Sequence, residues 1–324
     1  MQSLAATAVD SARPRVPVTY SGPCPSCGHE HALHATPWAV HAARRLMDAL
    51  WRTGSMGTTP TGVPVSTQAM FSPGGGHMLG VLVGWGARGE PVEGRAFSGQ
   101  VFGHWHLSGW VPPVVDPQRW EPWKTSTEAA IGALNRRIAA AQAQIASQEE
   151  QLSAQIEGLK RERDAALHAL DAATATRKGK RKVRYRFNRS LQPLQAELHH
   201  LRAPIVQWRQ ERRQLSRRLM RALHATYELT NAHGQTVPLL ELYEPYGTPP
   251  SGTADCCAPK LLHWAALRGI QPVGLAEFWW GFPSQRRHRA HAKLYSACEA
   301  KCKPLLGFLL CGAQHASDTR CTAE

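Results

Sequence analysis

The pattern of apolar and polar residues divides the chain into a mixed stretch, a long helical middle and a second mixed stretch. Residues 38–51 repeat apolar positions at helical spacing with arginines on the other face, which predicts an amphipathic helix. The apolar runs 78–85 and 94–101 flank a glycine-containing turn and predict a β-hairpin. We therefore expect residues 37–125 to form the first part of an α/β (α+β) domain.

The middle third has the periodicity of a long helix. Over residues 126–172 the apolar positions recur at spacings of three, four or seven, which is typical of a coiled-coil seam. The seam residues are Ile131, Leu134, Ile138, Ile145, Leu152, Ile156 and Leu159. We expect this helix to be one arm of an inserted antiparallel helical hairpin.

The basic run 177–189 interrupts this pattern, and we place the break at Gly179. A second helical stretch over 190–227 forms the other arm, kinked or restarted at Pro193 and Pro204. The whole insertion then spans residues 126–227.

Globular patterning returns in residues 228–324, the second part of the α/β domain. A helix begins near Pro259, Pro272–Gly281 has the pattern of a buried strand, and an apolar helix follows Pro304. Residues 1–36 remain as an N-terminal tail with a candidate zinc knuckle. The expected fold is thus a sheet with helices, interrupted by the helical hairpin.

The charge of the chain indicates an anionic partner. Its 324 residues carry a formal net charge of +14, which favours nucleic acid first and an acidic membrane surface second. Between Lys160 and Arg221 there are eighteen Lys and Arg against five Asp and Glu. A projecting basic hairpin suits sequence-independent contact with RNA phosphates. The alternatives are a solvated helix face and a hairpin that pairs with another chain.

The candidate RNA-binding residues cluster at the expected tip of the hairpin. They are Arg177, Lys178, Lys180, Arg181, Lys182, Arg184, Tyr185, Arg186 and Arg189. Tyr185 and Phe187 are interleaved with the cations, which adds aromatic surface to the positive charge.

Eight cysteines suggest metal ligation. The sequence shows neither the apolar core of a signal peptide nor a membrane-spanning run, so we expect a cytoplasmic protein. In that compartment cysteines are better explained by metal ligation or by reduced buried thiols than by disulfides.

Cys24 and Cys27 form a knuckle of the zinc-ribbon kind, in which Gly28 allows the backbone to fold back. It is half a site, and its nearest further ligands are His29 and His31, with His34 close behind. The alternative is a pair of unligated surface cysteines.

A second candidate zinc site comprises Cys256, Cys298 and Cys302. Each lies where a helix is expected to begin, so the helix dipole favours the thiolate that a metal needs. The fourth ligand would be Cys257, His288 or His291. Cys311 and Cys321 fit no ligand spacing and are expected to be free thiols.

Several sequence blocks resemble one family. GHMLGVLVGW, RAFSGQ, GWVPPVVD, PPSGTADCCAPKLLHWAALRGIQPVGLAEFWWG and ACEAKCKPLLGFLL look, in this order, like the long N-terminal region that precedes the catalytic domain of some bacterial RluA-type pseudouridine synthases. Those isomerases convert uridine in tRNA and ribosomal RNA with an aspartate in an Arg-Leu-Asp motif. This chain contains no Arg-Leu-Asp, so the resemblance implies a role in RNA modification and not the reaction itself.

The order of elements is also similar to the zinc-dependent deaminase fold, once the helical hairpin is treated as an insertion. This resemblance implies that Cys256, Cys298 and Cys302 hold zinc and that a water at the fourth position attacks a base. The cysteine pair is spaced Cys-x-x-x-Cys rather than Cys-x-x-Cys, and Ala258 stands where the fold has its general acid/base glutamate. Asp255 and Glu277 are the carboxylates that could substitute.

Our interpretation of the sequence is an RNA-binding accessory module that works with a pseudouridine synthase catalytic domain on tRNA or ribosomal RNA. The alternatives are a zinc-dependent nucleobase or nucleotide deaminase and a coiled-coil assembly protein that oligomerises through the hairpin. No membrane partner is expected.

Overall fold

A computed structural model describes residues 18–172, 176–284, 288–299 and 301–313. It is a mixed structure of helices and strands in two compact units. One unit combines residues 1–119 with 223–324, and the other comprises residues 120–222. The expected α+β class and long helical hairpin are confirmed. Within the described part of the chain, no helix is both long and apolar enough to cross a membrane.

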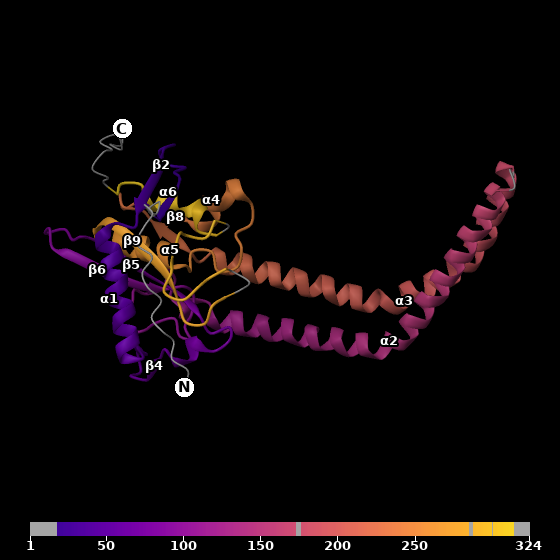
Figure 1. The fold of residues 1–324 in the computed structure, drawn as a ribbon, viewed down its shortest axis with the longest axis horizontal. Coiled ribbons are helices and arrows are strands. Elements are labelled where there is room, and N and C mark those ends of the chain that lie inside the picture. The colour runs from indigo at the N-terminus through magenta and orange to yellow at the C-terminus, as the bar shows by residue number, and fades with distance from the viewer. Residues whose placement is uncertain (1–17, 173–175, 285–287, 300, 314–324) are drawn as a thin grey trace. The chain divides into compact units, whose positions relative to one another are not determined.

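A four-stranded antiparallel sheet forms the centre of the first unit (Figure 1), in the order β10-β9-β5-β6. Its strands are β5 (His77–Trp85), β6 (Pro91–Phe97), β9 (Gln271–Trp280) and β10 (Leu294–Tyr295). The predicted hairpin is therefore confirmed as β5 and β6, and the predicted buried strand as β9. The returning strand ends at Phe97 and not at Val101, because Gly99 turns the backbone with a φ of +61° and Val101 forms only an isolated bridge to His104.

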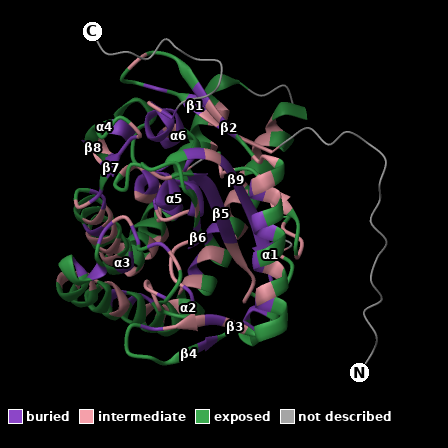
Figure 2. Ribbon diagram, turned by 90° about the vertical axis from the view of Figure 1, so that its left-hand side faces the viewer, coloured by how far each residue is buried: buried purple, intermediate pink, exposed green. Residues whose placement is uncertain are grey.

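Two helices cover opposite faces of this sheet (Figure 2), namely α1 (Pro37–Thr53) and α5 (Cys257–Ala266). The alternation of side chains along a strand decides which residues each helix meets. Leu79, Val81 and Phe278 lie in the core with α1. Gly80 and its partner Glu277 point to the other face, where a Cβ at Gly80 would lie 2.8 Å from Cys257 Cβ. The α5 face therefore carries the cysteines.

The described part of the expected N-terminal tail, residues 18–36, packs against the rest of its unit. Its strands β1 (Thr19–Pro23) and β2 (Glu30–His34) form a hairpin that packs on α6 (Lys303–Leu310). The contact depends on two glycines, since a Cβ on Gly22 or on Gly307 would run into backbone atoms of the other element. This hairpin was missed in the sequence because its strands are short and polar.

Several short elements lie outside the segments for which the sequence predicts a helix or a strand. They are β3 (Ser55–Thr58), β4 (Pro64–Ser66), η1 (Gln68–Phe71), η2 (Pro117–Arg119), β7 (Glu228–Thr230), β8 (Thr236–Pro238), α4 (Leu239–Tyr243) and η3 (Glu244–Tyr246). Elements of three to five residues are too short to show a period, so hydrophobic patterning does not detect them.

The second unit consists of α2 (Glu121–Ala172) and α3 (Arg177–His224). Cross-helix contacts pair Gln148 with Glu197 and Glu149 with Arg202, and Arg137 stacks on Trp208 at 4.1 Å. The residue numbers rise on one arm as they fall on the other, as an antiparallel pair requires. The buried seam is Leu134, Ile138, Leu152, Ile156, Phe187, Leu191, Ile205 and Leu219.

The predicted break at Gly179 is wrong. The basic run 177–189 forms the first turns of α3, and Pro193 and Pro204 lie inside the same helix. One glycine costs a helix only about 1 kcal/mol, and burial of Phe187 and Leu191 in the seam offsets that cost. Helix α2 ends at Ala172 and α3 begins at Arg177, and residues 173–175 lie outside the described residues.

Candidate functional site

Cys256, Cys298 and Cys302 lie together although 42 residues separate the first two. We call these residues the thiol trio. Cys256 is the N-cap of α5, and Cys302 is the N-cap of α6. The Sγ atoms of Cys256 and Cys298 are 3.8 Å apart, and those of Cys298 and Cys302 are 3.2 Å apart. Two thiolates bound to one tetrahedral zinc at about 2.3 Å would be about 3.8 Å apart. The trio could therefore hold a metal ion.

The protonation of the trio is shared. Hydrogen bonds with Cys256 and then Cys302 lower the pKa of Cys298 far below its usual range. Hydrogen bonds with Cys256 and with Cys298 raise the pKa of Cys302. The hydrogen bond with Cys298 is also the largest cause that raises the pKa of Cys256. Without metal, these directions favour ionisation of Cys298 over ionisation of its two neighbours.

This charge state predicts how metal binding depends on pH. Zinc requires three thiolates, so binding at the trio should release two protons, and the dissociation constant should fall about 100-fold per pH unit around neutrality. Calorimetry in buffers of different ionisation enthalpy measures the protons released. Cys302→Ser should abolish the proton-releasing binding of zinc at the trio, and Cys257→Ala should keep it. Binding that does not depend on pH would contradict the proposed ligands.

The remaining fourth-ligand candidates lie outside the trio. Cys257 is fully buried, and its thiol donates to the carbonyls of Met78 and Ala96. The Nδ1 atom of His291 accepts from the Gly281 N–H, and its ring packs on Trp280. His288 is exposed and its carbonyl faces the Tyr295 hydroxyl. Among the described residues, the ligand atoms that could share one metal ion here are those of the thiol trio, with no fourth member.

Of the two candidate carboxylates, Glu277 lies beside Ala258, the position that has no carboxylate of its own. Its Oε1 accepts from the backbone N–H of Ala258 at 2.8 Å, in the first turn of α5, two residues after Cys256. Burial raises the pKa of Glu277 to about 8, although the Ala258 N–H acts in the opposite direction. A carboxyl group with this pKa can both accept and donate a proton near neutrality.

Asp255 has a structural role instead. Its Oδ1 accepts from the Tyr227 hydroxyl at 2.8 Å, and its backbone carbonyl accepts from Gly99 N–H. Burial raises the pKa of this carboxyl, against the effect of the Tyr227 hydrogen bond. Asp255 thus ties the loop after β6 to the start of α5 and fixes the turn that presents Cys256.

A second group unites Cys24, Cys27, His31 and Cys311, and we call it the knuckle group. These four ligand atoms all lie within 4.8 Å of one another. Cys24 and Cys27 occupy the turn between β1 and β2, where Gly28 has a φ of +73°, and Cys27 Sγ is 3.1 Å from His31 Nε2. His29, which we expected among the ligands, lies outside the group. Cys311, which we expected to be a free thiol, belongs to it. Cys321 lies outside the described residues.

The chemistry of the knuckle group also fits a metal. Burial acts to raise the pKa of Cys27, but the backbone N–H of His29 and the side chains of His29 and His31 lower it to about 6. Burial and the neighbouring Cys24 raise the pKa of Cys311. The spacing in sequence could not reveal Cys311, because it comes from the opposite end of the chain.

Helix α6 joins the two groups. Cys302 caps its first turn and Cys311 its last, with eight helical residues between them, which corresponds to about 12 Å of helix. A metal at the knuckle group would therefore hold the far end of the helix whose near end presents Cys302. The knuckle group, with four ligands, has the composition of a closed structural site, whereas the trio has three.

The candidate RNA-binding residues lie along the first turns of α3. Most of their side chains are exposed, and Tyr185 is 70% exposed. Lys180 pairs with Asp171; over the described residues no other member of this set forms an ion pair. Phe187 instead belongs to the buried seam, where Arg186 stacks on it.

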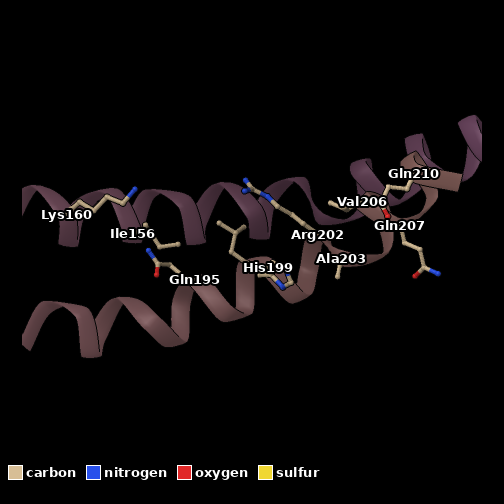
Figure 3. A pocket seen from close by; sticks show the side chains of 10 residues that line it. Ile156, Lys160, Gln195, His199, Arg202, Ala203, Val206, Gln207 and Gln210 are labelled. Carbon is tan, nitrogen blue, oxygen red and sulfur yellow. The ribbon is translucent and has the colours of Figure 1, made fainter. Parts of the chain in front are cut away.

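The surface of the helical hairpin is hollowed in several places. A depression between α2 and α3 is lined by Ile156 and Lys160 from one helix and by Gln195, His199 and Arg202 from the other (Figure 3). Another lies at the start of α3, where Lys178, Gly179, Arg181, Lys182 and Tyr185 surround it. The second offers cations and an aromatic ring on one concave surface.

Comparison with known proteins returned no match to a family model, to a curated protein or to a solved structure.

Proposed function

We propose that this protein binds structured RNA through the start of α3 and is an accessory module of an RluA-type pseudouridine synthase that modifies tRNA or ribosomal RNA. The observation that carries the proposal is the row of exposed cations over 177–189, of which one is paired with an acid in the described structure. Unpaired cations on a helix attract polyanions, and each phosphate contact releases counterions.

Tyr185 favours RNA over a membrane surface. Its exposed ring shares a concave surface with Lys178, Arg181 and Lys182. Unstacked bases in RNA loops bind by stacking on such rings while cations contact the backbone. A membrane-binding helix would instead need a broad exposed apolar face, and on this helix the apolar residues Phe187 and Leu191 are buried in the seam.

The resemblance to the RluA-type enzymes supplies the context of RNA modification. Because the chain has no Arg-Leu-Asp motif, the isomerisation would come from a pseudouridine synthase catalytic domain with which this module acts. The α+β unit, with a deaminase-like order of elements, would hold the hairpin and its zinc-binding groups.

The test replaces Arg181, Lys182, Arg184 and Arg186 together by glutamine. Binding of tRNA or ribosomal RNA fragments should weaken. The salt dependence should also become shallower, with the slope of log K against log salt smaller in magnitude by about 3, because four phosphate contacts are lost. Fluorescence anisotropy at several salt concentrations measures both. Unchanged affinity would overturn the proposal.

A matched variant distinguishes RNA contact at the start of α3 from general attraction of RNA by positive charge. Arg209, Arg213, Arg217 and Arg221 are four exposed arginines further along the same helix, so their replacement by glutamine removes the same charge. This variant should keep most of the affinity. Equal loss in both variants would show non-specific attraction, and a dimer without RNA affinity in sedimentation would favour the assembly protein.

A further inference from the structure

We propose that a surface beside α1 on the α+β unit binds an unpaired RNA strand, with aromatic rings stacking on bases and cations contacting phosphates. Its residues are Arg44, Trp51, Phe71, His291 and Lys293, and we call it the α1 surface. It belongs to the α+β unit, whereas the start of α3 belongs to the helical unit. The inference rests on the proposed function in that RNA is the partner, but it concerns a different surface.

Exposed aromatic rings form one end of the α1 surface. Trp51 is 69% exposed and Phe71 is 39% exposed. Both rings pack edge-on against the buried Trp280, with ring centroids 6.5 and 6.0 Å away. His291 lies 4.6 Å from Trp280 and 5.2 Å from Phe71. A single exposed apolar residue needs no explanation, whereas a cluster of them marks a binding surface, and exposed rings bind bases by stacking without sequence preference.

These rings are held in place before a partner binds. Trp51 lies in the last turn of α1, Phe71 is the last residue of η1, and both rest on Trp280 of β9. Burial lowers the pKa of His291, so its ring is neutral at pH 7, and its Nδ1 accepts from the Gly281 N–H. The ring proton is therefore on Nε2, which can donate to a base carbonyl or a 2′-hydroxyl. Fixed rings lose little conformational entropy on binding.

A groove continues from the rings along α1. It has a volume of about 790 Å³ and lies between α1 and the segment that leads into the edge strand β10. Met47 lines it one turn before Trp51, and Ala292 lines it directly after His291 in the chain. From Arg44 to Trp51 the helix rises about 10 Å, which is the length of about three stacked nucleotides at a phosphate spacing of about 3.4 Å.

The charge of the groove is complementary to phosphate. Its cationic side chains are Arg44 and Lys293, both exposed, and none of its described lining residues is acidic. Neither cation forms an ion pair with another described residue, whereas the adjacent Arg45 is paired with Glu93 at 2.7 Å. Unpaired cations beside stacking rings suit a single strand, because its bases stack while its backbone contacts the cations.

A membrane surface is the competing partner for exposed rings and cations, but α1 does not present the face that it requires. A helix that lies in a membrane interface needs a broad exposed apolar face. The apolar residues that α1 would insert are instead buried in the core with the sheet, namely Ala39, Ala42, Ala43, Leu46 and Leu50. An unpaired RNA strand therefore fits the surface better.

The decisive variant is Trp51→Ala in the full chain, with an eight-nucleotide oligoadenylate as the probe. Binding at the start of α3 is removed by working in the background of the variant in which glutamine replaces Arg181, Lys182, Arg184 and Arg186. Affinity for the octamer should fall about 5- to 150-fold, because the stacking of one base is lost. Trp51→Phe keeps a stacking ring and should restore most of the affinity. Fluorescence anisotropy measures both, and an affinity that Trp51→Ala leaves unchanged would overturn the inference.

The matched control is Trp85→Ala. Trp85 is 45% exposed and packs on Trp38, with ring centroids 5.1 Å apart, near the other end of α1. This variant removes an equally exposed indole from outside the α1 surface and should keep the affinity for the octamer. Equal loss in the Trp51 and Trp85 variants would show general attraction to apolar surface and would overturn the inference.

The salt dependence tests the cations. Arg44→Gln together with Lys293→Gln should make the slope of log K against log salt smaller in magnitude by about 1.4, since each phosphate contact of a single strand contributes about 0.7. Arg45→Gln together with Arg95→Gln removes the same charge from the pair of arginines that contact Glu93 of β6, at the opposite edge of the sheet from β10. This control should keep the slope, and the same change in both pairs would contradict phosphate contact at the groove.

The two proposals fail separately. If the α3 variant with four glutamines loses affinity for structured RNA and keeps octamer binding that depends on Trp51, both hold. If that variant binds structured RNA as the wild type does while octamer binding depends on Trp51, the α3 site falls and the α1 surface stands. If Trp51→Ala has no effect on the octamer, the α1 surface falls alone. Phosphatidylserine vesicles that bind through Trp51, without binding of the octamer, would assign the surface to a membrane and overturn the inference.

Discussion

Replacement of Cys311 by serine should remove one equivalent of zinc and destabilise the α+β unit by several kcal/mol. Cys311 is the one member of the knuckle group from the C-terminal half of the chain, so its loss removes the metal link between the β1–β2 hairpin and the end of α6. Structural zinc sites bind with apparent free energies of about 10–16 kcal/mol, and a site with one ligand changed retains only part of that. Metal analysis and thermal unfolding, with and without a chelator, measure the effect.

The matched control is Cys257→Ser. Cys257 is as deeply buried as Cys311, but it donates to backbone carbonyls and belongs to neither metal-binding group. A serine there can still donate, so zinc content should not change and the loss of stability should be smaller. If a chelator lowers the melting temperature of Cys311→Ser as much as that of the wild type, the knuckle group carries no structural metal.

Gly307→Ala should destabilise the protein even though alanine is the better helix former. In an isolated helix the change would gain about 1 kcal/mol. Here the new Cβ would lie within 2.2 Å of Pro23 backbone atoms and 2.6 Å of the Gly22 carbonyl oxygen. Backbone cannot move aside as a side chain can, so overpacking should cost about 1–3 kcal/mol or more. Chemical denaturation measures the free energy of unfolding.

Gly158→Ala in α2 provides the opposite expectation. Apart from its own stretch of helix, no atom lies within 4 Å of the added Cβ, so this variant should gain about 0.5–1 kcal/mol from helix propensity alone. Opposite signs for the two variants would show that close approach of β1 to α6 decides the first. If Gly307→Ala were destabilising, as expected, it should also weaken zinc binding at Cys24. If it were stabilising, α6 and the β1–β2 hairpin would not be in the contact described.

Strong periodicity explains which elements could be predicted. The helix over 38–51 and the long arm over 126–172 each bury one face, so their apolar residues recur with the helical period. Strands β5 and β9 are covered on both faces, so they stand out as continuous apolar runs. The start of α3 was mispredicted because Gly179 and a dense run of cations look like a loop, while its buried residues Phe187 and Leu191 are sparse. At the start of α3, packing of the buried residues in the seam therefore outweighs the low helix propensity of glycine.

The sequence by itself determined the α+β class, the long basic hairpin, and the residue types of two thiol-rich sites, because charge, period and cysteine spacing are local properties. Only the tertiary structure decided which residues meet. Cys311 joins Cys24 through the fold of α6 onto β1, and Glu277 reaches Ala258 because β9 pairs with β5 at Gly80. Such contacts depend on strand register and on helix packing across hundreds of residues, and neither leaves a local mark in the chain.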